Sequence, residues 1–395
     1  MKIISVVGAR PNFMKIAPFI QAIVQYNKLK TDNLQSITHL LVHTGQHYDE
    51  RMSKTFFEEL GIPKADINLG IGSGTHAEQV GQTMIAFEKV LEAEKPVWVV
   101  VVGDVNATLA CSVTAKKMHI KVCHIEAGLR SGDERMPEEI NRLVTDRLSD
   151  LLLTPDTFSS ENLRKEGVPE EKIKFVGNIM IDTLESNRKN AQKLNVTKII
   201  ESNLINGQSF ENQGLSPRGI GVKQSSFALL TMHRPSNVDQ KEILEPVIRF
   251  LLDEVSGDMP IIWPIHPRSQ NQLQSFGLWN EVVASDKLIL LHPLGYNEML
   301  KLNMAAHIML TDSGGLQEEC TVLGTPCLTL RWNTERPITL RENGGASVLV
   351  GNNILRIREE YKNTLNLNRT PDRPELWDGK TAERVLEAIL KANSK

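Results

Sequence analysis

The stretch that decides the fold is His124–Arg142, HIEAGLRSGDERMPEEINR, whose first residues end a β-branched run and predict a strand that runs out at Glu126 into a glycine turn. After a polar loop, Pro137 suits the first position of a helix, because its fixed φ and missing N–H are tolerated there. That helix carries an apolar stripe at helical spacing, made of Ile140, Leu143, Val144 and Leu148. Glu138 and Arg142 fall on the opposite face. Such opposed charges are either a solvated salt-bridge cluster, which contributes little to stability, or part of a site.

Three further runs of the same kind precede this one, and their position favours a site. The four runs are MKIISVVG (1–8), HLLVHTG (39–45), VWVVVVGD (97–104) and KVCHIEAG (121–128). Helical-period segments separate them, which is typical of βα units with a parallel sheet. Ligands bind beyond the carboxyl ends of the strands in such sheets. One pocket is therefore expected to collect the polar residues at these ends, which are Arg10, Gln46, His47, Asp104 and Glu126.

Length and composition limit the class of protein. A chain of 395 residues exceeds one ordinary core and predicts two domains of roughly 150 to 200 residues. The formal net charge of −3 argues against nucleic acid as a general partner. No signal peptide or long apolar run occurs, so a soluble protein without a membrane partner is expected. No C-x-x-C spacing links the cysteines, which predicts reduced core thiols and a cytoplasmic location; they are Cys111, Cys123, Cys320 and Cys327.

The first strand ends in GARPNFMKIAP (8–18), which has one glycine where a dinucleotide site needs G-x-G-x-x-G, so NAD binding is disfavoured. Arg10 and Lys15 at this turn suit a phosphate or another anion, helped by the helix N-terminus. A helix cap with a surface lysine is the alternative. Gln46 and His47 either contact a ligand or cap the next helix.

Carboxylates gather at the next two strand ends. Asp104 follows a fully apolar strand, where it is either an N-cap or a catalytic carboxylate. Glu126 ends the following strand, and Glu138 and Glu139 lie nearby in the sequence. Carboxylates that share a cleft move one another's pKa values apart, which divides acid and base roles between them.

The alternation restarts in the second half, after Gly177 and Asn178. Its strand runs deliver polar residues at their ends, among them His233, Arg234, His266, Arg268, His292, Asp312 and Ser313. We therefore predict an α/β protein of two Rossmann-like, doubly wound domains that face each other across a cleft.

The segment TDSGGLQEE (311–319) is the most specific element of this half. Gly314 and Gly315 let a diphosphate approach the free N–H groups of a helix start, and Ser313 can donate a hydroxyl. Glu319 on the first turns can accept both hydroxyls of a ribose. A tight turn with an acidic first helical turn is the alternative. His233 can act as a cation toward phosphate or as a proton donor to a leaving group.

Together these motifs resemble the non-hydrolysing UDP-N-acetylglucosamine 2-epimerases, which have the two-domain GT-B fold. The resemblance covers nearly the whole chain, and it is carried in order by GARPNFMKIAP, GQH, GD, HIEAGLRSGD, PEEINR, GN-x-x-ID, HR, LTDSGGLQEE, G-x-P and TERP. It implies reversible inversion at C2 of UDP-GlcNAc to give UDP-ManNAc, through anti elimination of UDP, a 2-acetamidoglucal and re-addition. It implies no cofactor and no metal.

Residue by residue, the resemblance makes Asp104, Glu126 and Glu138 the catalytic carboxylates, while the role of each stays open. It also implies contacts to substrate or nucleotide from Arg10, Lys15, Arg142, His233, Ser313, Gly314 and Glu319. Arg268 and Gly315 stand at the same strand ends and complete the candidate set. In the bacterial enzymes a second, activating UDP-GlcNAc binds partly to a Gln-His pair, here Gln46 and His47.

The resemblance also sets the domain boundaries and the partners. It implies an N-terminal domain over 1–178, a UDP-binding domain over 179–378, and a last helix over 379–395 that packs back on the first domain. A homodimer is implied as well. Two departures from the family pattern are RPSN after His233, and HPLGYNEML, where Tyr296 and Met299 replace a phenylalanine of some members.

Three alternatives stay open. The first is a 2-epimerase for another UDP-sugar, such as a 2,3-diacetamido uronic acid, whose C6 carboxylate Arg135 or Arg331 could bind. The second is a hydrolysing 2-epimerase that releases free ManNAc and UDP. The third is a GT-B glycosyltransferase or an inactive sugar-nucleotide-binding protein, against which the three carboxylates of the first half argue.

Overall fold

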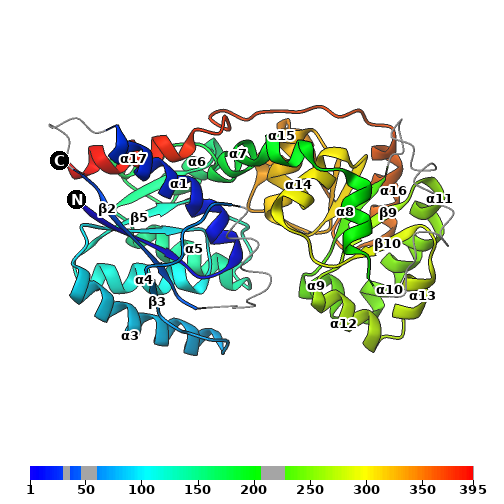
Figure 1. Ribbon diagram of the computed structural model, residues 1–395, viewed down its shortest axis with the longest axis horizontal. Helices are drawn as coiled ribbons and strands as arrows, with labels where there is room; N and C mark the ends of the chain where they lie inside the picture. Colours follow the sequence, from blue (N-terminus) through cyan, green and yellow to red (C-terminus); the bar gives the residue numbers. More distant parts are fainter. Residues whose placement is uncertain (30–35, 46–59, 206–226, 395) are drawn as a thin grey trace. The chain divides into compact units, whose positions relative to one another are not determined.

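The chain folds into two compact units, drawn in Figure 1. The computed structural model describes residues 1–29, 36–45, 60–205 and 227–394, apart from the side chain of Arg10. The N-terminal unit comprises Met1–Ser186 and Pro374–Lys395, and the C-terminal unit comprises Asn187–Arg373. The chain thus changes unit at 186 and 373, whereas the sequence motifs placed these points at 178 and 378. The change of unit at 186 lies within the helix α7 (Ile179–Lys193), whereas 178 directly precedes that helix.

The N-terminal unit is built on a parallel sheet of seven strands in the order β3-β2-β1-β4-β5-β6-β7. The strands are β1 (Lys2–Val7), β2 (Thr38–His43), β3 (Ile67–Asn68), β4 (Trp98–Val102), β5 (Lys121–Ile125), β6 (Leu151–Thr154) and β7 (Ile173–Phe175). Every residue of β4 is buried, as expected for a strand covered on both faces. Val102 pairs with Ile125, so β4 and β5 leave the sheet at the same level.

Helices cover this sheet, and one of them buries its polar face instead of its apolar face. They are α1 (Arg10–Lys28), α3 (His76–Glu94), α4 (Asn106–Lys117), α5 (Pro137–Leu148), α6 (Thr157–Lys165), the first part of α7, and α17 (Thr381–Asn393), with a 3₁₀ turn at Glu170–Lys172. The apolar stripe of α5 faces outward: Ile140 is 43% and Val144 36% exposed. Its buried residues are polar, namely Glu139, Asn141, Arg142, Thr145 and Asp146. The stripe therefore belongs to the surface, and the polar face belongs to the interior.

The C-terminal unit has a parallel sheet in the order β10-β9-β8-β11-β12-β13. The strands are β8 (Ala228–Thr231), β9 (Ile261–Pro264), β10 (Leu288–Leu291), β11 (Ile308–Thr311), β12 (Cys327–Thr329) and β13 (Ser347–Leu349). In chain order this is the 3-2-1-4-5-6 pattern of a dinucleotide-type doubly wound sheet. Apolar cores lie on both faces of the strands. The prediction of two Rossmann-like, doubly wound domains is confirmed.

Helices connect these strands. They are α8 (Val196–Asn203), α9 (Pro235–Val238), α10 (Lys241–Phe250), α11 (Ser256–Asp258), α12 (Pro267–Ser275), α13 (Trp279–Ala284), α14 (Tyr296–Ala305), α15 (Gly314–Leu323) and α16 (Ile354–Leu365). A π-helical turn spans Leu251–Val255, and 3₁₀ turns span Pro337–Thr339 and Arg341–Asn343. The four cysteines are free and buried, as predicted. Within the described residues, no helix combines the length and apolar character needed to cross a membrane.

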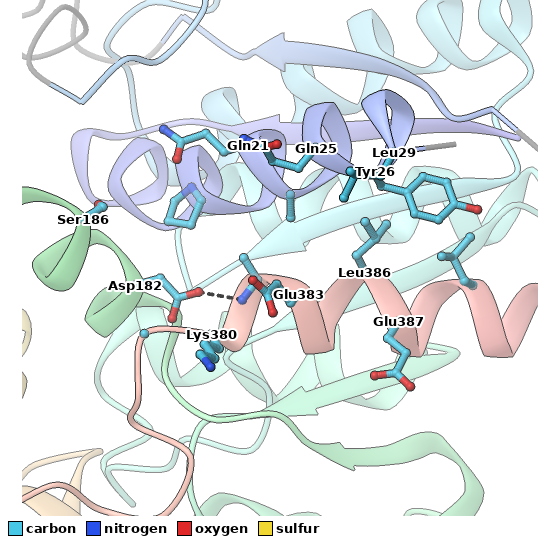
Figure 2. A pocket seen from close by; sticks show the side chains of 15 residues that line it. Gln21, Gln25, Tyr26, Leu29, Asp182, Ser186, Lys380, Glu383, Leu386 and Glu387 are labelled. Carbon is cyan, nitrogen blue, oxygen red and sulfur yellow. Dashed lines mark hydrogen bonds between the residues drawn. The ribbon is translucent and has the colours of Figure 1, made fainter. Parts of the chain in front are cut away.

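The last helix, α17, lies against α1 of the N-terminal unit (Figure 1). A groove of about 530 Å³ opens between the two helices, and Figure 2 shows Gln21 and Glu383 on its two walls. At one end the Asp182 carboxylate accepts the backbone N–H groups of Thr381 and Ala382, at 3.0 and 2.7 Å, and so caps α17. Burial outweighs these bonds and raises the pKa of Asp182 to about 6. The groove contains none of the residues predicted to form a site.

Candidate functional site

In the N-terminal unit, Glu126 lies beside the turn that follows β4. Its side chain is buried and forms an ion pair with the buried Lys15 of α1. Gly103 packs against the pair: a Cβ there would lie 3.4 Å from Lys15 Nζ and 3.5 Å from Glu126 Oε2. Glu126 has a φ of +69°, which strains a non-glycine residue by about 1–3 kcal/mol. The surroundings therefore hold this carboxylate in a conformation that the free chain avoids.

Asp104, at the neighbouring strand end, is bound by Arg142 of α5. The Nε and Nη2 groups of Arg142 donate to Asp104 Oδ2 at 3.0 and 2.8 Å. Arg142 is 2% exposed and also pairs with Glu139. Glu139 in turn accepts the N–H groups of Ser131 and Gly132, both at 3.0 Å. One buried cation thus joins a strand-end carboxylate to the loop before α5.

The structure places the other predicted residues of this half differently. Glu138 lies on the first turn of α5 and is exposed, whereas its neighbour Glu139 is buried. Sequence reasoning singled out Glu138 and missed the structural role of Glu139. Arg10 begins α1, and its side chain lies outside the described part, as do Gln46 and His47 entirely.

Two further buried residues of this unit, His124 and Asp146, were not predicted. His124 Nδ1 lies 2.6 Å from Asp146 Oδ1. The sequence contained one indication for Asp146: it lies four residues after Arg142, so the two side chains share one face of α5.

In the C-terminal unit, His233 follows β8, and its side chain is 43% exposed. Its Nδ1 lies 3.0 Å from Asp312 Oδ1, while the backbone N–H groups of His233 and Arg234 donate to Asp312 Oδ2 at 2.8 Å each. Burial tends to raise the pKa of Asp312, but these bonds and the charge of His233 hold it below its ordinary value. Asp312 therefore orients an imidazole that remains accessible to a ligand.

The helix α15 begins at Gly314 and Gly315, directly after Ser313, as the glycine motif predicted. A Cβ on Gly314 would lie 2.7 Å from Arg336 Nη1. The close approach of this guanidinium is therefore one reason for the glycine. The prediction had attributed the glycine to an approaching diphosphate, which needs the same open backbone.

Glu319, on the second turn of α15, is 3% exposed and accepts a hydrogen bond of 3.0 Å from the Tyr296 hydroxyl. Burial raises the pKa of Glu319 to about 7, although the bond from Tyr296 opposes this. Tyr296 is one of the two residues, with Met299, considered in place of a phenylalanine of some members, and its hydroxyl donates to Glu319.

A buried ionic network behind α15 was also missed from the sequence. Arg336 pairs with Glu318, at 2.6 Å, and with Glu335. Arg331 pairs with Glu335 at 2.5 Å and is 5% exposed. The signal was the alternation of charge within LRWNTERP, read only as a family motif.

Arg268, by contrast, is a surface residue of α12. It donates to Asp239 at 2.5 and 2.9 Å, and the two side chains are 45% and 30% exposed. Across residues 1–29, 36–45, 60–205 and 227–394, no group of three or more His, Cys, Asp or Glu side chains could hold a metal ion.

Comparison with known proteins assigns this arrangement to a family. The model of the family described as UDP-N-acetylglucosamine 2-epimerase matches residues 28–390. The chain belongs to this family. Within it, the chain is 41% identical over 391 residues to the UDP-N-acetylglucosamine 2-epimerase of Methanocaldococcus jannaschii, an alignment that covers 98% of this chain and 99% of the relative. The resemblance seen in the motifs is confirmed.

One other relative and one solved structure are also similar to this chain. The UDP-2,3-diacetamido-2,3-dideoxy-D-glucuronate 2-epimerase of Pseudomonas aeruginosa is 36% identical over 393 residues, covering 99% of this chain and all of the relative. The crystal structure of the M. jannaschii UDP-GlcNAc 2-epimerase in complex with UDP-GlcNAc and UDP matches with a TM-score of 0.85 and 41% identity, over 99% of this chain and 100% of that one.

Proposed function

We propose that this chain inverts C2 of UDP-N-acetylglucosamine reversibly, giving UDP-N-acetylmannosamine, without hydrolysis and without a cofactor. The observation that carries the proposal is the pair of carboxylates at adjacent strand ends, Asp104 and Glu126, each held by a buried cation. Family membership and the M. jannaschii complex with UDP-GlcNAc support the substrate.

The chemistry requires such a set of groups. The C2 hydrogen of the sugar is not acidic, so the C1–O bond to UDP must break ahead of proton removal, and a carboxylate must stabilise the positive charge that develops at the ring. A base then removes the C2 proton, which leaves 2-acetamidoglucal and UDP. Re-addition of UDP at C1, with a proton to the other face of C2, completes the inversion. Acid and base groups are therefore needed on two faces of one carbon.

We assign these steps to Asp104, Glu126 and Glu138 as a group and leave the role of each carboxylate open. Their surroundings support different roles. Glu126 is buried beside Lys15, Asp104 is about one quarter exposed beside Arg142, and Glu138 is exposed. Such differences in burial and pairing are what separate acid from base.

UDP is the ligand proposed for the second set of residues. Contacts to substrate or nucleotide are proposed for Arg10, Lys15 and Arg142 of the N-terminal unit, and separately for His233, Arg268, Ser313, Gly314, Gly315 and Glu319 of the C-terminal unit, with Glu319 toward the ribose. The start of α15, where Ser313 makes no side-chain capping hydrogen bond, supports the diphosphate site. The exposed His233 supports a role as cation or as proton donor to departing UDP. Because Lys15 and Arg142 already face carboxylates, a bound anion would share them.

The relative from P. aeruginosa supports a second candidate, epimerisation of a UDP-2,3-diacetamido uronic acid. The two arginines considered for a C6 carboxylate do not favour it. Arg331 is buried against Glu335, and the side chain of Arg135 is 91% exposed beside Asp133. UDP-GlcNAc is therefore the first substrate to test.

We further propose a cytoplasmic homodimer that supplies UDP-ManNAc for polysaccharide biosynthesis. Exposed apolar side chains on helices of the N-terminal unit support the dimer: Ile85 of α3 is 64% exposed, and Ile140 and Val144 of α5 are exposed as well. α4 contacts both of these helices. Replacing Ile140 and Val144 by serine should shift the protein to monomers in sedimentation velocity; an unchanged sedimentation coefficient would contradict this interface.

The deciding experiment is incubation with UDP-GlcNAc in D₂O, followed by proton NMR. Deuterium at C2 in a mixture of UDP-GlcNAc and UDP-ManNAc is expected, because the proton returns from solvent. Free ManNAc would identify a hydrolysing enzyme, and an unchanged spectrum would direct the same assay to the uronic acid nucleotide or to a transferase. An allosteric site at Gln46 and His47 predicts that UDP-ManNAc alone is turned over only after a lag, and a hyperbolic rate curve without one would exclude it.

A further inference from the structure

The imidazole of His124, on β5, is fully buried and lies between two acceptors. Its Nδ1 is 2.6 Å from a carboxylate oxygen of Asp146, and its Nε2 is 2.9 Å from the backbone carbonyl oxygen of Gly103. A carbonyl oxygen only accepts hydrogen bonds, and so does an ionised carboxylate. Both ring nitrogens must then carry a hydrogen, and His124 is an imidazolium cation.

The second carboxylate oxygen of Asp146 also has interaction partners. It accepts the backbone N–H of Gly128 at 3.0 Å and lies 2.7 Å from Arg130 Nη1. Arg130 also pairs with Glu166 at 2.7 Å. Burial would raise the pKa of Asp146, but the charges and hydrogen bonds of His124 and Arg130 outweigh it and place that pKa below its ordinary value. Asp146 is therefore ionised, as the charge on His124 requires.

The two backbone groups held in this way flank the catalytic carboxylates. Gly103 immediately precedes Asp104, and Gly128 follows Glu126 by two residues. Gly103, Glu126 and Gly128 have φ values of +68°, +69° and +83°, so both turns leave their strands in the left-handed region. At Gly128 a Cβ would lie 2.3 Å from the carbonyl oxygen of Ser159, so this turn packs closely against α6 and admits only glycine.

We propose that His124 and Asp146 are positioning residues that fix the distance between Asp104 and Glu126 by clamping the two turns to one buried ion pair. The inference rests on the proposed function, in which those two carboxylates act on one sugar carbon. Stability alone is a weak reason for such a pair, because a buried ion pair is often replaced by apolar side chains at little cost. A misplacement of about 1 Å can lower a rate by roughly 100-fold, so positioning is a sufficient reason.

Three variants test the clamp. His124→Phe keeps the ring and removes both donors, and Asp146→Asn keeps the shape and removes the charge. His39→Phe is the matched control, since His39 also lies in the sheet of this unit and bonds through Nε2 to Ser5 Oγ at 2.9 Å. We expect the first two to lower kcat about 10- to 100-fold with little change in KM, and the control to leave kcat within about twofold. The double variant His124→Phe/Asp146→Asn should cost no more than either single one, because the pair acts as a unit.

A lowered thermal midpoint with unchanged kcat in His124→Phe or Asp146→Asn would overturn the inference and leave a structural role only. Where a variant does not fold, ¹⁵N NMR of the wild-type histidines decides. A hydrogen on both ring nitrogens of His124 is expected, because each faces an acceptor, and a neutral tautomer would overturn the clamp. Turnover of the wild-type protein separates failure of the proposed function from failure of the clamp. An inactive wild type contradicts the proposed function. An active wild type together with an unchanged kcat in His124→Phe contradicts the clamp alone.

Discussion

Both units carry proposed site carboxylates near the carboxyl ends of their parallel strands, but Glu126 and Asp104 have different partners from Glu319. In the N-terminal unit two of the proposed carboxylates face a cation: the buried Glu126 faces Lys15, and Asp104, about one quarter exposed, faces Arg142. In the C-terminal unit the buried Glu319 accepts a neutral hydroxyl from Tyr296. The first arrangement gives each carboxylate a positively charged partner. The second leaves one near half protonation at neutral pH, because burial raises the pKa of Glu319 to about 7.

The difference corresponds to different tasks. A carboxylate that stabilises positive charge at a sugar carbon must hold one position, which pairing with a buried cation provides. A carboxyl group that accepts hydrogen bonds from the hydroxyls of a ribose can be neutral in the free protein and ionise when the ligand supplies hydrogen-bond donors. On the proposed assignment, Asp104 and Glu126 already face cations in the free protein, whereas Glu319 would ionise when the ligand binds.

The largest effect should come from removing the cation shared by two buried carboxylates. Arg142→Met leaves Asp104 and Glu139 without their common partner, and the loss of one member of a buried pair costs about 3–5 kcal/mol. Arg268→Met is the matched control, because its partner Asp239 is exposed and such pairs contribute about 0.2–1 kcal/mol. Urea unfolding of both variants measures the difference. Equal losses would mean that burial does not distinguish the two pairs.

The next effect is on turnover. Replacing Asp104, Glu126 or Glu138 by its amide should lower kcat by at least about 100-fold, or 2.7 kcal/mol of barrier. The isosteric Glu170→Gln is the control, since Glu170 is a surface residue paired with Arg164. Near-normal turnover in all three amides would refute the catalytic assignment. A loss confined to Asp104 and Glu126 would assign the chemistry to the two paired carboxylates.

The sequence predicts the fold more completely than the site, for physical reasons. Buried β-branched runs and glycine turns are local signals, so both sheets and the α15 start at Gly314 could be predicted. The pairing of charges is not local. The carboxylate that Arg142 binds lies 38 residues away in Asp104, and the acceptors of His124 come from residues 103 and 146.

The helix α5 shows where a local rule fails. Its apolar stripe predicted a buried face containing Ile140, yet the buried face carries Glu139, Arg142 and Asp146. Periodicity identifies which residues share a face, but it cannot tell whether that face meets the core or the surface. Here the interior offers charged partners for the polar face, and they come from elements distant in the sequence.

A smaller effect concerns the pH dependence of ligand binding in the C-terminal unit. If the ribose hydroxyls donate to ionised Glu319, binding releases a proton, so affinity rises with pH through the pKa of about 7. From pH 6 to 8 the Kd should fall about tenfold, which is 1.36 kcal/mol. The Kd is measured by calorimetry with UDP-GlcNAc on the Glu126→Gln variant. This variant avoids turnover of the ligand, and UDP-GlcNAc lacks the terminal phosphate of UDP, which would itself titrate in this pH range. In the same background Glu319→Gln should give a flat profile, and a flat profile with Glu319 intact would contradict the ribose contact.

The smallest effect tests the hydroxyl that distinguishes Glu319 from the paired carboxylates. Tyr296→Phe removes a hydrogen bond that favours the ionised carboxylate. A hydrogen bond to a charged group contributes about 1.5 kcal/mol, so the pKa of Glu319 should rise by about one unit. Ligand affinity should then be about twofold weaker at pH 8 than with Tyr296 present, and its midpoint should move from about pH 7 toward 8. An unmoved midpoint with unchanged affinity would show that burial alone sets the protonation of Glu319, and that the hydroxyl only fills space beside α15.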